Sequence, residues 1–284
     1  MLSINPKDLS IPALQKYLQS AVAPRPICFA SSISKNGEVN LAPFSFFNIF
    51  SSNPPIAVFS PAYSGRTGAP KDTLLNILEV PECVINIVNY NMVHQTSLAS
   101  SPFTKGINEF KKAGFTELKS ELVTPPRVLE SPVQLECKVI EVKELGKQGG
   151  AGNLIICEII KIHINEAILN SENQIDTTKI DLVARMGDNW YCRANGNALF
   201  EVQKPITTIG IGFDAIPNEI KNSTILTGNN LGLLGSVENL PTQTEIDNYK
   251  NNVPKFNSEN EKHLFAQSLL QLNKVKEAWM VLLS

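Results

Sequence analysis

A cation and a hydroxyl stand at the start of an apolar-periodic segment, Lys71-Asp72-Thr73-Leu74-Leu75-Asn76-Ile77. The free backbone N–H groups of a first helical turn point at an anion, and the positive end of the helix dipole favours it. Lys71 adds a full charge and Thr73 a hydroxyl donor. The segment therefore has the chemistry of a phosphate site. The alternative is that Asp72 or Thr73 only caps a surface helix, with Lys71 solvated.

A proline and small polar residues stand upstream, in the segment Asn40 to Asn48. A strand-like run and an Asn36-Gly37 hairpin signal precede it, which places the segment at an irregular strand end. Pro43 removes a donor from the ladder, and Ser45 and Asn48 offer hydrogen bonds to whatever lies alongside. Such an edge suits a planar heteroaromatic ligand with carbonyl and ring-nitrogen acceptors.

The order and spacing of several motifs resemble the flavin reductase-like family over about residues 20 to 205. These motifs are Pro24-Arg25-Pro26, Asn40 to Asn48, Asn53-Pro54-Pro55, Lys71-Asp72-Thr73, Glu82 to Val88, Ser131 to Cys137 and Trp190-Tyr191. The resemblance implies a split β-barrel that binds FMN, usually as a homodimer. Reduction of flavin by NAD(P)H is the commonest activity in the family, and some relatives only carry electrons.

Carried over residue by residue, the resemblance also implies the cofactor contacts. These are Ser31, Ser32, Pro43, Ser45, Phe46, Asn48, Lys71 and Thr73. The isoalloxazine edge would be held by Pro43, Ser45, Phe46 and Asn48. Ser31 and Ser32 would lie beside the ribityl chain or the phosphate. Lys71 and Thr73 would hold the phosphate itself. For Phe46 a place in the core is an equal alternative, because closely spaced aromatic residues commonly pack inside a protein.

Composition excludes several classes of partner. The chain has 284 residues, of which 43% are hydrophobic and 18% charged, enough for a sizeable core. A net charge of −2 provides no basic field for nucleic acid or an anionic membrane. No apolar run reaches the length of a membrane helix, and prolines interrupt residues 1 to 26 where a signal peptide would need a hydrophobic centre. We therefore expect a cytoplasmic protein.

Cysteine and histidine are too scattered for a disulfide framework or a metal centre. The five cysteines are widely spaced, and only three histidines occur. We expect the cysteines to be core thiols and His163 to be structural. His94 follows the strand expected at Cys83 to Val88, and it is either structural or a neighbour of the nicotinamide, as a histidine is in some flavin reductases.

Other nucleotide and hydrolase motifs are missing from the sequence. Gly210-Ile211-Gly212 lacks the third glycine of a Rossmann fingerprint, and no P-loop or G-x-S-x-G elbow occurs. A nicotinamide would therefore lie beside the flavin, without a dedicated domain. The sequence does not choose between NADH and NADPH, although Arg66 is a candidate by position for the extra phosphate of NADPH.

Periodicity predicts a mainly β fold with peripheral helices. Strands are expected at Ile27 to Ser34, Val39 to Pro43, Ile56 to Ser60, Cys83 to Val88, Val133 to Leu145, Leu154 to Ile164 and near Ala184 to Cys192, and helices at Thr73 to Val80, Met92 to Leu98 and Phe103 to Lys112 before a Gly114 cap. On the strand from Val133, alternation places Gln134, Glu136 and Lys138 on a wet or polar face.

The character of the chain changes near Pro205, so we divide it into a flavin reductase-like FMN-binding split-barrel domain, residues 1–204, and a helical C-terminal extension, residues 205–284. Ser258 and Glu261 form a capping-box pattern before one last helix, with apolar residues from Leu264 to Leu282 near helical spacing. This extension lies outside the motifs. It is either a structural cap or a helix that docks a partner.

Together these features predict an FMN-binding oxidoreductase that transfers a hydride from NAD(P)H to flavin. In such a reaction the cofactor carries the chemistry, and no side chain need act as a general acid or base. The alternatives are an FMN electron carrier reduced by a protein partner, and a non-enzymatic flavin-binding module on the same barrel.

Overall fold

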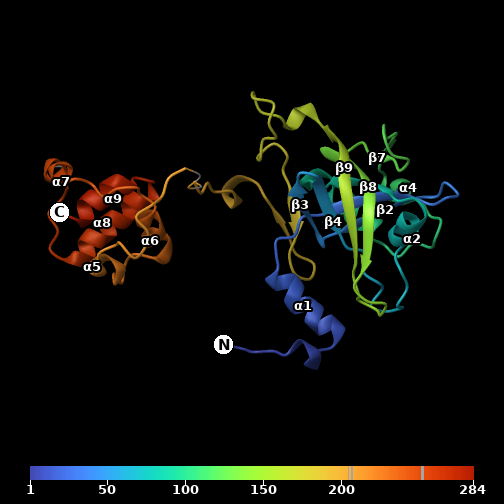
Figure 1. The fold of residues 1–284 in the computed structure, drawn as a ribbon, viewed down its shortest axis with the longest axis horizontal. Coiled ribbons are helices and arrows are strands. Elements are labelled where there is room, and N and C mark those ends of the chain that lie inside the picture. Colours follow the sequence, from blue (N-terminus) through green and yellow to red (C-terminus); the bar gives the residue numbers. More distant parts are fainter. Residues whose placement is uncertain (204, 206, 251–252) are drawn as a thin grey trace. The chain divides into compact units, whose positions relative to one another are not determined.

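The computed structural model describes residues 1–203, 205, 207–250 and 253–284, which form two compact units, Met1–Phe200 and Glu201–Ser284 (Figure 1). Lys204, where the expected domain boundary falls, lies outside the described residues. Each unit has its own buried apolar core. We describe the two units separately.

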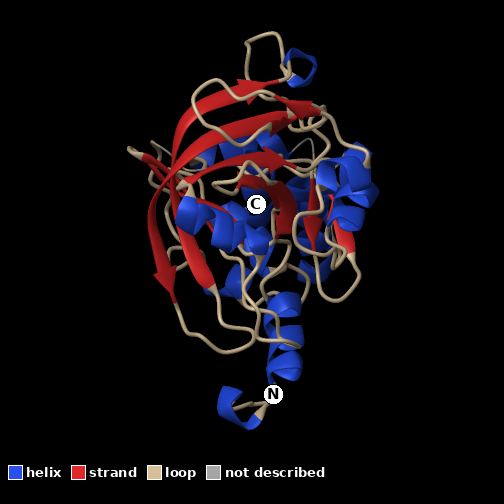
Figure 2. Cartoon of the chain, turned by 90° about the vertical axis from the view of Figure 1, so that its right-hand side faces the viewer, coloured by secondary structure: helices blue, strands red, loops and turns tan. Residues whose placement is uncertain are grey.

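One antiparallel sheet of seven strands dominates the first unit. Its strands are β1 (Cys28–Ile33), β2 (Val39–Phe44), β3 (Phe47–Ser52), β4 (Pro55–Phe59), β5 (Glu82–Ile87), β8 (Val133–Glu144) and β9 (Asn153–Ile164). They lie in the order β2-β1-β5-β8-β9-β4-β3. The two edge strands, β2 and β3, are consecutive in the chain and joined only by Ser45 and Phe46. The sheet must therefore curl until its edges approach, and Figure 2 shows its strands curving around the interior.

This arrangement confirms the mainly β fold with peripheral helices. Strand β3 was missed by the sequence pattern, because its apolar residues are mostly exposed. The segment expected near Ala184 to Cys192 is a small hairpin of β10 (Val183–Arg185) and β11 (Tyr191–Arg193). A second small pair joins β6 (Glu117–Leu118) to β7 (Arg127–Val128).

The face of β8 that was expected to be wet is polar but buried. Gln134 is 7% exposed and Glu136 is fully buried, whereas Lys138 is exposed. The Glu136 carboxylate accepts hydrogen bonds from three successive backbone N–H groups, those of Glu121, Leu122 and Val123, and from His163 at 2.7 Å. A connecting segment therefore covers this face, and its backbone donors satisfy the buried charge.

Short helices surround the sheet. They are α1 (Ile11–Ala21), α2 (Asp72–Glu79), α3 (Val93–Ala99) and α4 (Glu109–Ala113), with 3₁₀ turns η1 (Pro6–Asp8), η2 (Tyr90–Met92), η3 (Glu166–Ile168) and η4 (Gly196–Ala198). Helix α1 was not expected, and α4 is much shorter than the predicted Phe103 to Lys112. The cap at Gly114 is confirmed, since this residue has a left-handed φ of 73° and ends α4.

The second unit is helical. Its elements are α5 (Asn218–Lys221), α6 (Gly228–Gly235), α7 (Gln243–Lys250), α8 (Glu259–Gln271) and α9 (Val275–Leu282). The single last helix expected from the sequence is wrong, because Asn273 takes a φ of 58° and divides it into α8 and α9. The Ser258 cap is present, its side chain accepting from the Glu261 N–H.

The core of the second unit is built around Trp279. This side chain is fully buried, and its indole N–H donates to the Leu234 carbonyl at 2.9 Å.

Among the described residues of both units, we find no helix that is long and apolar enough to cross a membrane.

Candidate functional site

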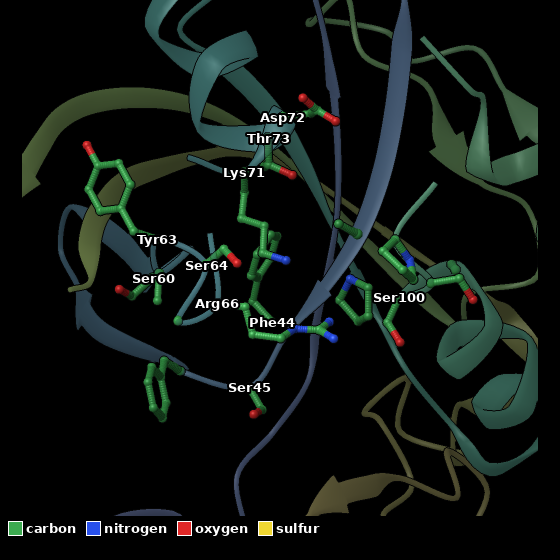
Figure 3. Close-up of a pocket in the computed structure, with 18 of the residues that line it drawn as sticks. Phe44, Ser45, Ser60, Tyr63, Ser64, Arg66, Lys71, Asp72, Thr73 and Ser100 are labelled. Carbon is green, nitrogen blue, oxygen red and sulfur yellow. The ribbon is translucent and has the colours of Figure 1, made fainter. Parts of the chain in front are cut away.

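A cavity of about 650 Å³ opens in the first unit, where the joint between β2 and β3 meets the start of α2 (Figure 3). Its volume is in the range of small-molecule and cofactor sites. Residues from six parts of the chain line it: α1, β2 with its joint to β3, the loop after β4, the start of α2, the end of α3 with the segment after it, and the start of α4. The curl of the sheet brings these parts together.

One side of the cavity is built to hold an anion. Lys71 is the N-cap of α2 in extended backbone, and no side chain among the described residues caps the helix. The Leu74 N–H donates to the Lys71 carbonyl at 3.0 Å, which leaves the N–H groups of Asp72 and Thr73 for a ligand. Figure 3 shows the side chains of Lys71 and Arg66 extending into the same part of the cavity. Two exposed cations and a helix N-terminus thus converge there.

The Thr73 hydroxyl is fixed by a buried network. Thr73 is 1% exposed, and its Oγ1 accepts a hydrogen bond from the Asn40 amide at 2.8 Å. Since that bond uses an oxygen lone pair, the Thr73 O–H remains able to donate toward the cavity. The Ser32 hydroxyl accepts from Asn40 at 3.5 Å and from Asn76 at 3.2 Å. Ser32 therefore lies behind the lining and supports the residues that form it.

The other side of the cavity is the end of β2 and its joint to β3. Pro43, Ser45 and Phe46 all line it. Phe46 is 43% exposed, whereas Phe44 and Phe47 on either side are buried in the core. Of the two alternatives for Phe46, the structure excludes a place in the core. The Phe46 carbonyl accepts from the Ser60 N–H at 2.9 Å, which fixes the joint against the end of β4.

Five of the eight expected contacts line this cavity, namely Pro43, Ser45, Phe46, Lys71 and Thr73. Ser31, Ser32 and Asn48 do not. Ser31 is fully buried, and its hydroxyl donates to the Pro126 carbonyl. Asn48 lies on β3, and its side chain accepts from the Ile49 N–H.

The sequence did not indicate several other lining residues. Tyr63 and Ser64 come from the loop after β4, and Ser100 from the segment after α3. The only sequence signal was the polar, glycine-containing composition of these loops, which does not predict where a loop lies. Glu109, at the start of α4, is 9% exposed and accepts from the Leu41 N–H at 2.9 Å. Burial raises the pKa of its carboxyl, and the hydrogen bond only partly offsets this.

His94 lies in a second cavity, of about 450 Å³, between α3 and the β10–β11 hairpin. Tyr90 and Tyr191 also line it, and each carries an arginine over its ring. Arg193 lies 3.8 Å from the Tyr90 centroid, and Arg185 lies 4.7 Å from that of Tyr191. The 650 Å³ cavity is not lined by His94.

The cysteines are free thiols, and four of the five are buried. The sulfur atoms of Cys83 and Cys157 lie 3.7 Å apart in the core of the first unit. Among the described residues, no group of three or more His, Cys, Asp or Glu side chains is placed to hold a metal ion.

Comparison with known proteins decides the family. The model of the flavin reductase like domain matches residues 20–178, more than half of the chain. The chain belongs to the flavin reductase-like family. This confirms the resemblance carried by the motifs and relates the chain to flavin-binding oxidoreductases. The match does not reach the second unit.

Two relatives match this chain over most of their own length. An uncharacterized protein of Halalkalibacterium halodurans is 36% identical over 67% of this chain and 91% of that protein. Another, from Aquifex aeolicus, is 32% identical over 69% of this chain and 97% of that protein.

Two solved structures share both fold and recognisable sequence with this chain. Nitrilotriacetate monooxygenase component B from Bacillus cereus is 29% identical, with a TM-score of 0.66, and the match covers 71% of this chain and 98% of that one. The 2-nitrobenzoate 2-nitroreductase of Pseudomonas fluorescens is 26% identical, with a TM-score of 0.63, over 74% of this chain and 100% of that one.

Proposed function

We propose that the 650 Å³ cavity binds FMN and that the protein is a flavin reductase, transferring a hydride from NAD(P)H to flavin. The observation that carries this proposal is that the two ends of one cavity differ in their chemistry. A cationic helix start lies at one end, and a proline-containing strand end with hydroxyl donors lies at the other. FMN has the matching halves, a phosphate and a planar ring with polar edges.

The phosphate half would be held by the side chains of Lys71, Arg66 and Thr73 and by the backbone N–H groups of Asp72 and Thr73. Each supplies a donor, and the two cations also supply charge, so together they suit a dianionic phosphate. The network of Asn40 and Ser32 holds the Thr73 oxygen in place before a ligand arrives. Such preorganisation lowers the entropic cost of binding.

The ring half would lie along Pro43, Ser45 and Phe46. Pro43 has no N–H to donate from this edge strand, and Ser45, just past the end of β2, has a backbone and a hydroxyl able to bond a ring edge. Bound FMN would supply hydride chemistry, accepting two electrons and a proton from a reduced nicotinamide. The chain's part would be to fix the ring, so that a nicotinamide can be held against it.

The proposal includes a homodimer in the cytoplasm. Helix α1 has no buried residue, although it carries apolar side chains, and Tyr17 and Leu18 are 51% and 54% exposed. Phe50 on β3 is 70% exposed. A second copy covering these side chains would remove apolar surface from water. Light scattering should then give about twice the chain mass of 31.2 kDa. The five free thiols support a reducing compartment.

Steady-state oxidation of NADH and NADPH, with and without added free flavin, tests the activity. Turnover supports the reductase. FMN that binds without turnover would favour an electron carrier reduced by a protein partner, and absence of flavin binding would favour a non-enzymatic module. A Lys71→Ala variant should need more FMN to reach the same rate, because it weakens the phosphate site.

A further inference from the structure

Arg25 is a buried cation at the end of α1. It lies in the Pro24-Arg25-Pro26 segment just before β1, and it is 6% exposed. Its backbone is fixed, since the N–H groups of Arg25 and Arg185 each donate to the other's carbonyl at 2.9 Å. Arginines are almost never this buried without a paired charge.

The guanidinium is held by uncharged groups. It donates to the Val22 carbonyl at 2.9 Å, to the Gln19 carbonyl and to the Met186 carbonyl at 2.7 Å. Its Nε lies 3.5 Å from the Ser45 hydroxyl oxygen. Among the described residues, no carboxylate lies within ion-pair distance of it. Only carbonyl dipoles, including those of the last turn of α1, offset the charge.

Arg25 remains a cation at neutral pH. Burial lowers its pKa, and the nearby charge of Arg185 lowers it further. The ordinary pKa of arginine is so high that the side chain stays protonated in proteins. A full positive charge therefore lies beside Ser45, which lines the cavity at the end proposed for the flavin ring.

That position matters when the flavin is reduced. The oxidised ring system is neutral. A hydride brings two electrons and one proton from the reduced nicotinamide, whose ring becomes cationic, and the flavin ring gains one negative charge. A cation close by in a poorly solvated wall stabilises this added charge and has little effect on the neutral ring.

Resting on the proposed function, we propose that Arg25 makes the cavity bind reduced flavin more tightly than oxidised flavin and so raises the reduction potential of bound FMN. The residue does not touch the reacting atoms in this account. It acts through its charge across the Ser45 wall.

The size of the effect is estimated from the Coulomb energy of one charge acting across a side chain. At an effective dielectric constant of about 20, loss of the cation should weaken the preference for reduced flavin roughly 10- to 100-fold. For a two-electron couple this corresponds to about 30–60 mV.

The test compares three variants with the wild type by two measurements on the full chain. Arg25→Gln removes the charge and keeps donors. Arg25→Lys keeps the charge and loses the planar fork. Arg185→Gln is the matched control, because Arg185 is the partner of Arg25 in the backbone pair and its guanidinium donates to the Asp188 carbonyl, which is not part of the cavity lining. The affinity for oxidised FMN is measured by fluorescence titration, and the potential by anaerobic reductive titration against a reference dye.

We expect the potential to fall by about 30–60 mV in Arg25→Gln and to stay near the wild-type value in Arg25→Lys. In Arg185→Gln it should shift by no more than the equivalent of about a threefold change in the relative affinity for reduced flavin. An Arg25→Gln variant that binds FMN with an unchanged potential overturns the inference. Equal drops in Arg25→Gln and Arg25→Lys also overturn it, because the anchoring of α1 would then be responsible. If the wild type itself binds no FMN, the proposed function fails first, and the titration of oxidised FMN reports that separately.

Discussion

Replacing Lys71 with alanine should weaken FMN binding and leave riboflavin binding nearly unchanged. Lys71 stands at the N-cap of α2, and its side chain extends into the cavity beside Arg66 (Figure 3). Riboflavin has the ring and ribityl chain of FMN but lacks the phosphate. The difference between the two ligands therefore isolates the phosphate site from the rest of the cavity.

The expected magnitude is set by exposure. A charge-assisted hydrogen bond contributes roughly 1.5–3 kcal/mol when well shielded. Lys71 is exposed, so solvent screens its charge, and Arg66 remains in the same part of the cavity. We therefore expect a loss of about 1–2 kcal/mol in FMN binding, or roughly 5- to 30-fold in Kd. Arg66→Ala should act in the same direction.

Isothermal titration or flavin fluorescence quenching measures both ligands under identical conditions. Lys138→Ala is the matched control, because Lys138 is an exposed lysine on β8 that does not line the cavity. FMN binding to the wild type should weaken as salt rises, and this dependence should be smaller in Lys71→Ala. Equal losses for FMN and riboflavin would refute the reasoning, since Lys71 would then support the local fold and not the phosphate.

The part of the site that sequence predicted best is the part that depends on local chemistry. Lys71 and Thr73 precede an apolar-periodic helix, and a helix start creates its own anion site from adjacent residues. The segment from Pro43 to Phe46 was found because proline and small polar residues mark a strand end. Each of these two signals is made by residues within a few positions of one another in the chain.

The parts that sequence missed depend on distant contacts. Arg25 stands in a recognised motif, but it meets Met186, which is 161 residues away. Nothing local indicates this contact. Likewise, alternation placed Glu136 on a polar face but did not reveal the backbone donors that cover it. The apolar residues near the C-terminus recur at helical spacing and so predict one helix, but Asn273 adopts a left-handed conformation and separates α8 from α9.

Three further predictions concern stability and titration. Burial alone would raise the pKa of Glu136, but the backbone N–H groups that donate to its carboxylate, together with His163, hold that pKa below its usual range. The ionised carboxylate therefore stabilises the fold above pH about 4.3, and this stabilisation is lost as the pH falls through the lowered pKa. Glu136→Gln should lower the free energy of urea unfolding by roughly 1–3 kcal/mol at neutral pH and by less in acid, and an equal loss at the two pH values would contradict this. The Lys276 ammonium, with the N–H and hydroxyl of Thr242, lowers the pKa of Glu245 to about 2. NMR titration should find a midpoint near that value, and Lys276→Ala should raise it; an unchanged midpoint would show that Lys276 is not the main cause. Trp279→Ala should destabilise the second unit by about 3–5 kcal/mol in chemical unfolding followed by circular dichroism, and a change below about 1 kcal/mol would show that its burial was misjudged.

The central claim is that the 650 Å³ cavity binds FMN for reduction by a nicotinamide. The absorption spectrum of the FMN-loaded protein, recorded before and after anaerobic addition of NADH and of NADPH, tests this claim most directly. We predict the spectrum of oxidised, bound flavin at the start and its bleaching by at least one of the two donors. A protein that takes up no FMN, or whose bound flavin neither donor reduces although dithionite does, would contradict the account.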